Sequence, residues 1–211
     1  WYQFGSALSA MEAIAEDTLF VGHVTNFVKN DAEVISMASA DSVEMMIEQG
    51  VSLMTFFGHA SGDGFDLNID NVSNYDWGGR YPTVIGNSCY TGNIHLTTST
   101  SSSEQFVLPG TQGAIAFLAS VDIGVSGLLS SYSGEFYRSF SYLNYGGSIG
   151  QHMQHSIKVN LDASDDILNL NNVQTFTLHG DPTLRLYSFD RPDLTVDADD
   201  ISFSPVPVTA D

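Results

Sequence analysis

The chain has very little of three things: cysteine, basic residues and long apolar runs. A single cysteine, Cys89, among 211 residues excludes an intramolecular disulfide and a zinc site built from thiolates. Six basic residues against 25 acidic ones give a net charge of -19, which argues against nucleic acid and anionic membrane surfaces as partners. No stretch of about 18 apolar residues suggests a membrane span. The lone thiol is therefore either core filler or a chemical group.

The apolar content of 43%, with 13 Phe and 9 Tyr, is enough to build one substantial core. We expect a main domain over residues 1–189. Residues 190–211 alternate in polarity and contain several prolines, so we interpret them as a linker and the first strand of a truncated β-sandwich. The chain opens on Trp1 without a leader, and we expect it to be a processed or engineered fragment.

Three apolar runs of strand length each end in a polar, glycine-bearing loop. They cover residues 51–57, 81–88 and 113–120. Near-continuous apolarity is typical of parallel strands covered on both faces. Helices are expected at 11–20, 42–49 with Asp41 as N-cap, 126–143 and 147–161; exposed loops at 66–80 and 96–104; and a turn followed by a closing strand within 176–187. The pattern predicts a three-layer α/β/α sandwich with a mainly parallel sheet.

Two of the strand-end loops carry the residues of a thiol nucleophile and its base. His59 follows the first run and Cys89 follows the second. Catalytic groups collect beyond the carboxyl ends of parallel strands, and a cysteine nucleophile needs a base such as histidine. The backbone N–H groups of Cys89 and Ala60 are candidates for an oxyanion hole. Either residue alone reads as an ordinary loop histidine or a buried thiol, whereas together they favour function.

The other five histidines do not share this placement: His23, His95, His152, His155 and His179. His152 and His155 are spaced as helical metal ligands can be, but no third ligand with clear spacing accompanies them. We therefore expect surface or packing roles for both and no metal site.

At these positions the sequence resembles the gingipain-like cysteine peptidases, family C25 of the caspase-like clan. The similar segments are 57–62, around the histidine, and 86–89, ending in the cysteine, together with 47–50, 113–117 and 178–185 in the same order. The resemblance spans roughly residues 33–187 and implies a caspase-like fold for the sandwich. One departure is Ala60, where the family usually has glycine. The N-terminal half-sheet of the family is missing or only partly present.

The resemblance implies a secreted endopeptidase in which Cys89 attacks the scissile carbonyl and His59 activates the thiol and protonates the leaving amine. The amides of Cys89 and Ala60 would hold the oxyanion, and Asp122 could face a basic substrate side chain. Expected partners are a protein or peptide substrate and other domains of the same precursor, including an Ig-like module begun by residues 190–211. The family also implies export, commonly by the type IX route, to the cell surface or beyond.

No cofactor is required for such chemistry, although calcium is a possible structural ion. Its candidate oxygen ligands are Asp63, Asp66, Asn68 and Asp70, whose spacing lacks the glycine and terminal glutamate of an EF-hand. Two alternatives remain open. The chain could be a catalytically silent surface scaffold with Cys89 buried, or a flavodoxin-like domain that binds a small ligand at the strand ends.

Overall fold

The computed structural model describes residues 2–20, 22–28, 37–61, 64–65 and 71–186. Its main sheet has four strands in the order β1-β4-β5-β6. These are β1 (Leu53–Phe57), β4 (Thr83–Asn87), β5 (Ala116–Ser120) and β6 (Phe176–Gly180). Strands β1, β4 and β5 are parallel, whereas β6 runs antiparallel to β5. The predicted mainly parallel sheet is confirmed, with one antiparallel strand at its edge.

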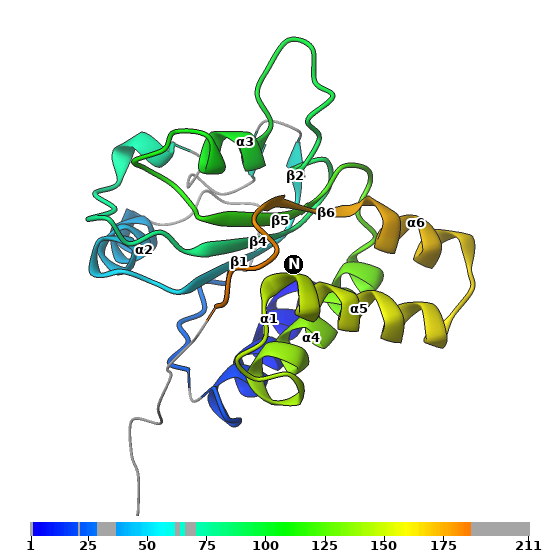
Figure 1. Ribbon diagram of the computed structural model, residues 1–211. Helices are drawn as coiled ribbons and strands as arrows, with labels where there is room; N and C mark the ends of the chain where they lie inside the picture. Colours follow the sequence, from blue (N-terminus) through cyan, green and yellow to red (C-terminus); the bar gives the residue numbers. More distant parts are fainter. Residues whose placement is uncertain (1, 21, 29–36, 62–63, 66–70, 187–211) are drawn as a thin grey trace, which may run out of the picture.

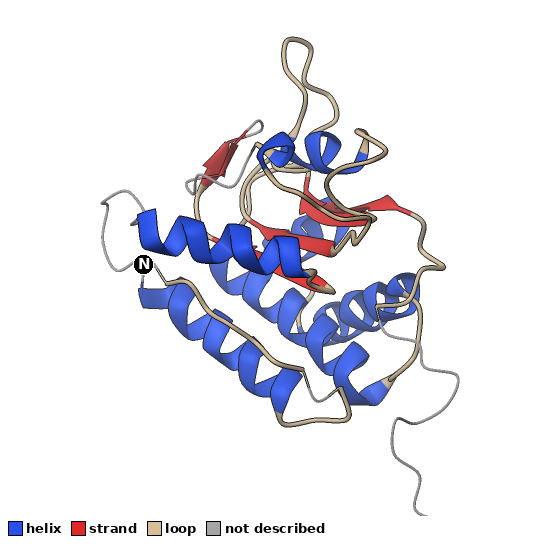
Figure 2. Cartoon of the chain, turned by 90° about the vertical axis from the view of Figure 1, so that its left-hand side faces the viewer, coloured by secondary structure: helices blue, strands red, loops and turns tan. Residues whose placement is uncertain are grey.

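Helices cover both faces of this sheet, as the two perpendicular views show (Figures 1 and 2). The α-helices are α1 (Tyr2–Glu16), α2 (Met37–Gln49), α3 (Ser102–Val107), α4 (Ser126–Arg138), α5 (Ile149–Ala163) and α6 (Ile167–Thr175). The shorter elements are the hairpin β2 (Ala60–Ser61) and β3 (Gly64–Phe65), the 3-10 turn η1 (Val72–Asn74) and the π-helical turn η2 (Ser139–Leu143). Helices α2 and α3 lie on one side of the sheet, and α1, α4 and α5 lie on the other (Figure 1).

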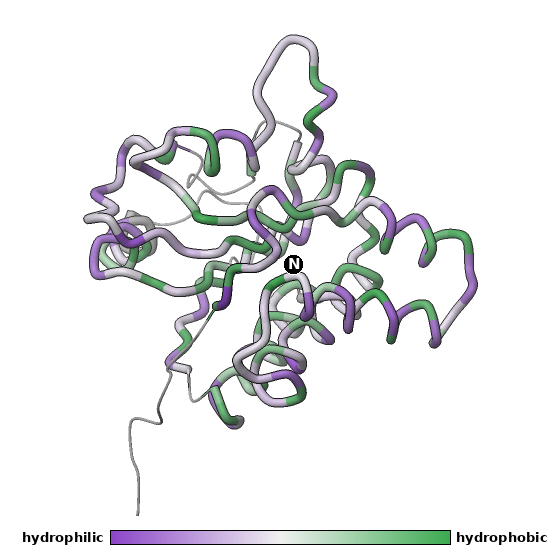
Figure 3. The backbone as a smooth tube through the Cα atoms, in the orientation of Figure 1, coloured by the Kyte–Doolittle hydropathy of each residue, from purple (hydrophilic) through white to green (hydrophobic). Residues whose placement is uncertain are grey.

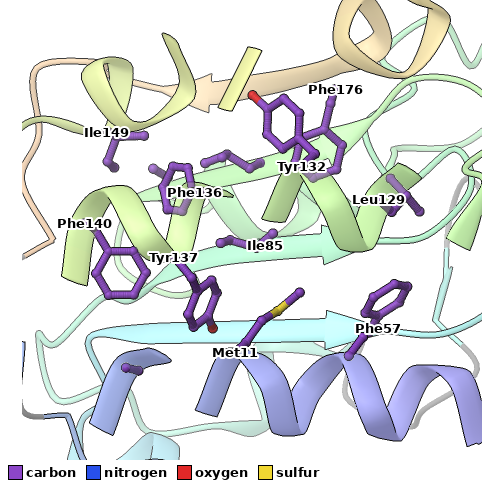
Figure 4. Packing of buried hydrophobic residues seen from close by; sticks show 14 of the residues in the cluster. Met11, Phe57, Ile85, Leu129, Tyr132, Phe136, Tyr137, Phe140, Ile149 and Phe176 are labelled. Carbon is purple, nitrogen blue, oxygen red and sulfur yellow. The ribbon is translucent and has the colours of Figure 1, made fainter. Parts of the chain in front are cut away.

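Each of the three parallel strands β1, β4 and β5 buries side chains on both faces of the sheet, which explains the continuous apolarity of these segments. Phe57, Ile85 and Leu118 belong to a core that they share with residues of α1, α4 and α5, and Figure 4 shows Phe57 and Ile85 within it. The preceding residues of the same strands, such as Phe56, Val84 and Phe117, belong to a second core with α2 and α3. Hydrophobic segments occur both in the sheet and along the helices that cover it (Figure 3). The α/β/α sandwich is thus confirmed.

Several predicted boundaries were wrong. Helix α1 covers Tyr2–Glu16 instead of 11–20. Helix α2 begins at Met37, so Asp41 lies inside the helix and is not its N-cap. The closing strand comes before its turn, because β6 ends at Gly180 and the turn follows it. Pairing with β5 determines this order, and the local sequence does not encode that pairing.

The two segments predicted as exposed loops are partly buried. In the hydroxyl-rich segment, Ser101 caps α3 by accepting a hydrogen bond from the Glu104 N–H, and the Glu104 carboxylate accepts one from the Ser101 N–H. In the segment 66–80, Trp77 is only 2% exposed and donates from Nε1 to the Val72 carbonyl at 2.8 Å. Both segments therefore contribute to the core that covers the sheet.

The expected domain boundary and β-sandwich strand fall on residues 187–211, which lie outside the described residues. Within the part that is described, no helix combines the length and apolarity needed to cross a bilayer. A cavity of about 610 Å³ runs along β1 and is lined by residues of α1, α2 and the segment 22–27. Neither His59 nor Cys89 lines this cavity, so the candidate chemistry lies elsewhere.

Candidate active site

The parallel pairing of β1 with β4 brings the predicted base and nucleophile to the same level of the sheet. Phe57, the last residue of β1, pairs with Asn87, the last residue of β4. His59 and Cys89 each follow two residues later. The pairing continues past the strand ends, because the Gly58 N–H donates to the Asn87 carbonyl at 3.3 Å. Neighbouring strands are about 4.8 Å apart, so the two segments leave the sheet side by side.

The contacts of both side chains place them on the α1 and α4 side of the sheet. The exposed His59 ring packs edge-to-face against Phe4 of α1, with ring centroids 5.2 Å apart. The partly buried thiol of Cys89 contacts Gly124, just before α4 begins. Because residues two apart along a strand share a face, this agrees with Phe57, which points toward the same helices (Figure 4). The fold does not separate the two residues across the sheet.

The third strand-end loop supplies a hydrogen-bond donor to the sulfur. The Gly124 N–H lies 3.4 Å from Cys89 Sγ, and the thiol faces the Gly124 carbonyl at 3.7 Å. A Cβ atom at position 124 would stand 2.5 Å from Leu129 Cδ1 and 3.1 Å from the Ser88 carbonyl oxygen. A side chain here would require Leu129 to move and would crowd the Ser88 carbonyl, so glycine favours the close approach of this loop to the cysteine.

A strained turn holds the cysteine at the end of β4. Tyr90 has a φ of +59°, which is uncommon for a residue with a side chain. Its N–H donates to the Asp122 carbonyl at 3.0 Å, and its own carbonyl accepts from the Asn93 N–H at 2.9 Å. The turn is thus fastened to the loop beyond β5. Backbone strain of this kind is found at sites where the surrounding structure fixes a functional residue.

Below the turn, the polar side chain of Asn87 is completely buried on the α4 side of the sheet. The Ser133 hydroxyl of α4 donates a hydrogen bond to Asn87 Oδ1. A buried polar pair costs free energy unless its members bond to each other, so this contact ties the end of β4 to α4. Cys89 therefore follows a strand end that is anchored by α4 as well as by its neighbouring strands.

The hairpin that follows His59 determines where the Ala60 N–H can point. Ser61 pairs with Gly64, and only two residues separate them along the chain. Ser61 and Gly64 therefore form the closing, hydrogen-bonded pair of β2 and β3. Hydrogen-bonded and non-hydrogen-bonded pairs alternate in an antiparallel ladder, so Ala60 and Phe65 form a non-hydrogen-bonded pair. The Ala60 N–H is therefore directed away from Phe65.

Asp122 lies in the loop beyond β5, beside the turn that carries the cysteine. Its carboxylate accepts a hydrogen bond from the Ile123 N–H at 2.7 Å, and its carbonyl accepts from the Ser120 hydroxyl at 3.0 Å. Asp122 is partly buried. These contacts show a role in holding the loop, and they leave its predicted contact with a basic substrate as a hypothesis.

The remaining candidates lie away from this site. His152 is buried against Phe136, with ring centroids 5.6 Å apart, and His155 faces the Glu135 carboxylate at 3.2 Å. In the described ranges, no group of three His, Cys, Asp or Glu residues is arranged to hold a metal ion. Of the possible calcium ligands, Asp63, Asp66, Asn68 and Asp70 all fall outside those ranges.

Sequence reasoning missed the contact from Gly124, the strain at Tyr90 and the hairpin after His59. A glycine in the third strand-end loop was the available signal for the first of these. The strain at Tyr90 carried no signal, because tyrosine is not a residue that favours a positive φ.

Comparison with known proteins agrees with this fold. The Arg-specific cysteine proteinase gingipain R (RgpB) superposes with a TM-score of 0.61 at 16% identity, covering 69% of this chain and 35% of that one. The complex of Porphyromonas gingivalis RgpB pro- and mature domains matches with a TM-score of 0.61, 16% identity, and 68% and 36% coverage. A further structure, described only as a protease, has a TM-score of 0.58 at 15% identity, covering 66% and 36%.

This chain therefore spans only about a third of the length of these structures. No curated protein matched the sequence. The sequence model of Peptidase family C25 matches residues 8–187, which is most of the chain and includes both His59 and Cys89. This match argues against the flavodoxin-like alternative. The chain belongs to peptidase family C25.

Proposed function

We propose that the chain hydrolyses peptide bonds as a cysteine endopeptidase, with Cys89 as nucleophile and His59 as general base and acid. The observation that carries this proposal is the register of the sheet. Phe57 pairs with Asn87, and the base and the nucleophile follow this pair at equal distances along two neighbouring parallel strands. Membership of family C25 supports the same reaction class.

In the proposed reaction, His59 takes the thiol proton and the Cys89 sulfur attacks the scissile carbonyl carbon. The carbon–nitrogen bond then breaks as the His59 imidazolium protonates the leaving amine, and a thioester remains on the sulfur. Water, deprotonated by His59, attacks this thioester and releases the carboxylate product together with the free sulfur. The Gly124 N–H, 3.4 Å from Sγ, stabilises negative charge on the sulfur before attack and after release.

The oxyanion formed by the attack is assigned to the backbone N–H groups of Cys89 and Ala60. On either side of Cys89, the N–H groups of Ser88 and Tyr90 already donate, to Gly86 O and to Asp122 O respectively. The N–H of Ala60 is directed away from its hairpin partner Phe65. Both donors belong to backbone that the fold fixes before substrate arrives. Donors arranged in advance in this way stabilise the negative charge that develops on the substrate oxygen in the transition state.

Thiol labelling tests the pairing without a substrate. At pH 6 an ordinary cysteine is ionised to well under about 1%, whereas a cysteine paired with imidazole reacts as a thiolate. We expect iodoacetamide to label Cys89 at least about tenfold faster than a free peptide cysteine. His59→Ala should abolish this excess. The matched control is His95→Ala, because His95 is an exposed histidine in the loop that follows Cys89.

Cleavage of an unfolded protein such as reduced casein is the second assay, with Cys89→Ser as the inactive reference. Equal labelling rates for the wild type and His59→Ala would contradict the dyad and favour a catalytically silent scaffold. Loss of the excess in His95→Ala, with the excess retained in His59→Ala, would show that His95 is the base and that the assignment to His59 is wrong.

We also propose that the protein acts outside the cell or at the bacterial surface and that other domains of its precursor contact it. The support is membership of family C25 and the similarity to RgpB, whose pro- and mature domains form a complex in one of the matched structures. Fractionation of the producing cells, with immunodetection of this chain in the medium and in the cytoplasm, would test the location.

A further inference from the structure

Exposed aliphatic side chains gather on the two loops that frame the thiol. Ile123 is 58% exposed and Val125 is 41% exposed, and they flank the glycine whose N–H contacts the sulfur. Ile94, in the loop that follows Cys89, is 52% exposed. These two loops are fastened together, because the Gly92 N–H donates to the Ser120 carbonyl at 2.9 Å.

The loop beyond β5 turns its glycine inward and the neighbouring aliphatic side chains outward. A Cβ atom on Gly124 would point at Leu129 and at the Ser88 carbonyl, both part of the packed interior. In extended backbone, adjacent side chains point in opposite directions, and Val125 has extended angles of φ −94° and ψ 116°. Ile123 and Val125 are therefore exposed on either side of Gly124, the residue whose N–H contacts the thiol.

We propose that these residues form an apolar contact surface for the substrate side chain that directly precedes the scissile bond. The proposal rests on the proposed peptidase function and names the substrate class for that site: peptides with an aliphatic residue such as leucine at this position. The position of the surface identifies the substrate group that it contacts. Gly124 contacts the attacking sulfur, so a peptide bound for attack must pass Ile123 and Val125, which adjoin Gly124. Exposed aliphatic side chains gain from being covered by an apolar group.

The competing candidate for this position is a basic side chain facing Asp122. Its carboxylate is already bonded to the Ile123 N–H at 2.7 Å and serves the loop itself. The side chains that the loop presents outward on either side of Gly124 are aliphatic, which makes the surface suited to an apolar group.

Covalent peptide probes measure this preference directly. Three acyloxymethyl ketones of the form Ac-Ala-Ala-X, with X as Leu, Gly or Arg, are compared by their second-order rates of labelling Cys89 in the whole chain. We expect the leucine probe to react at least about tenfold faster than the glycine and arginine probes, in line with the selectivity that apolar pockets reach. Ile123→Asp should reduce the ratio of leucine to glycine rates about tenfold.

The matched control is Ile115→Asp. Ile115 is 46% exposed and directly precedes β5, so it lies at the opposite end of the strand from the thiol. This substitution should leave the ratio unchanged. An unchanged ratio in Ile123→Asp would overturn the assignment to this loop.

An arginine probe that reacts as fast as the leucine probe would also overturn the assignment and would favour Asp122. In either case the proposed function stands if iodoacetamide still shows its His59-dependent excess. Absence of that excess would overturn both.

Discussion

Replacing the buried His152 should make the stability of the protein less sensitive to acid. The ring lies on α5 and packs edge-on against Phe136, with Nδ1 at 3.0 Å from the Ser139 hydroxyl. Burial lowers the pKa of His152 from 6.5 to about 4, a hydrogen bond with Gly147 opposes this shift, and the neighbouring His155 adds to it. The folded protein therefore holds this imidazole neutral.

The direction of the effect follows from linkage. The unfolded chain binds a proton at His152 near pH 6.5, whereas the folded chain does so only near pH 4. The contribution of the neutral ring to stability is complete above pH 6.5 and is lost as the pH falls toward 4. A difference of this size corresponds to about 3 kcal/mol in full, and most of it is lost between pH 7.5 and 4.5.

Urea unfolding followed by far-ultraviolet circular dichroism, at several pH values and constant salt, measures this contribution. Wild type should lose about 2–3 kcal/mol more than His152→Gln between pH 7.5 and 4.5, because glutamine carries no proton to titrate. The control is His95→Gln at an exposed site, which should follow the wild type. All other carboxylates and histidines, including Glu135 and His155, are common to the compared proteins. Parallel pH profiles for wild type and His152→Gln would refute the reasoning.

Two further substitutions test the support of the candidate site. Ser133→Ala should lower the free energy of unfolding by about 1–3 kcal/mol, because the buried Asn87 side chain would lose its hydrogen-bond donor. Urea unfolding measures this change. The control Ser126→Ala, at the start of α4, should change the free energy of unfolding by less than about 0.5 kcal/mol. Gly124→Ala should slow iodoacetamide labelling of Cys89 several-fold, because the added Cβ displaces the N–H from the sulfur. Gly127→Ala, where a Cβ meets nothing within 4 Å, should leave labelling unchanged.

The strands that carry the candidate site were predictable because burial on both faces leaves a simple mark. Residues 53–57, 83–87 and 116–120 were expected as strands within a residue or three of their bounds. Parallel order then followed from this continuous apolarity, and with it the placement of the segments carrying His59 and Cys89 at one edge of the sheet. Local sequence and topology were sufficient for this part.

Elements that depend on contacts between distant residues were not predictable in the same way. Helix α6 was missed because its asparagine-rich sequence has weak helix propensity. The buried Asn169 side chain instead donates to the Asn160 and Ser164 carbonyls, at the end of α5 and just beyond it. Helix α3 was missed although its signal was present: Ser101 followed three residues later by Glu104 is a capping box.

The position of β4 inside the sheet gives the cysteine that follows it neighbouring segments on both sides. Strand β4 has a parallel neighbour on each side, so its carboxyl end lies beside two other strand-end loops. Cys89 thus receives the segment carrying His59 from β1 and the Gly124 N–H from the loop after β5. Among the described residues, β1 has β4 as its only neighbouring strand, so a thiol at the end of β1 could not contact the loops beyond β4 and β5 equally. The segment that carries His59 and the loop that carries the Gly124 N–H therefore lie on opposite sides of the cysteine because the strand order is β1-β4-β5.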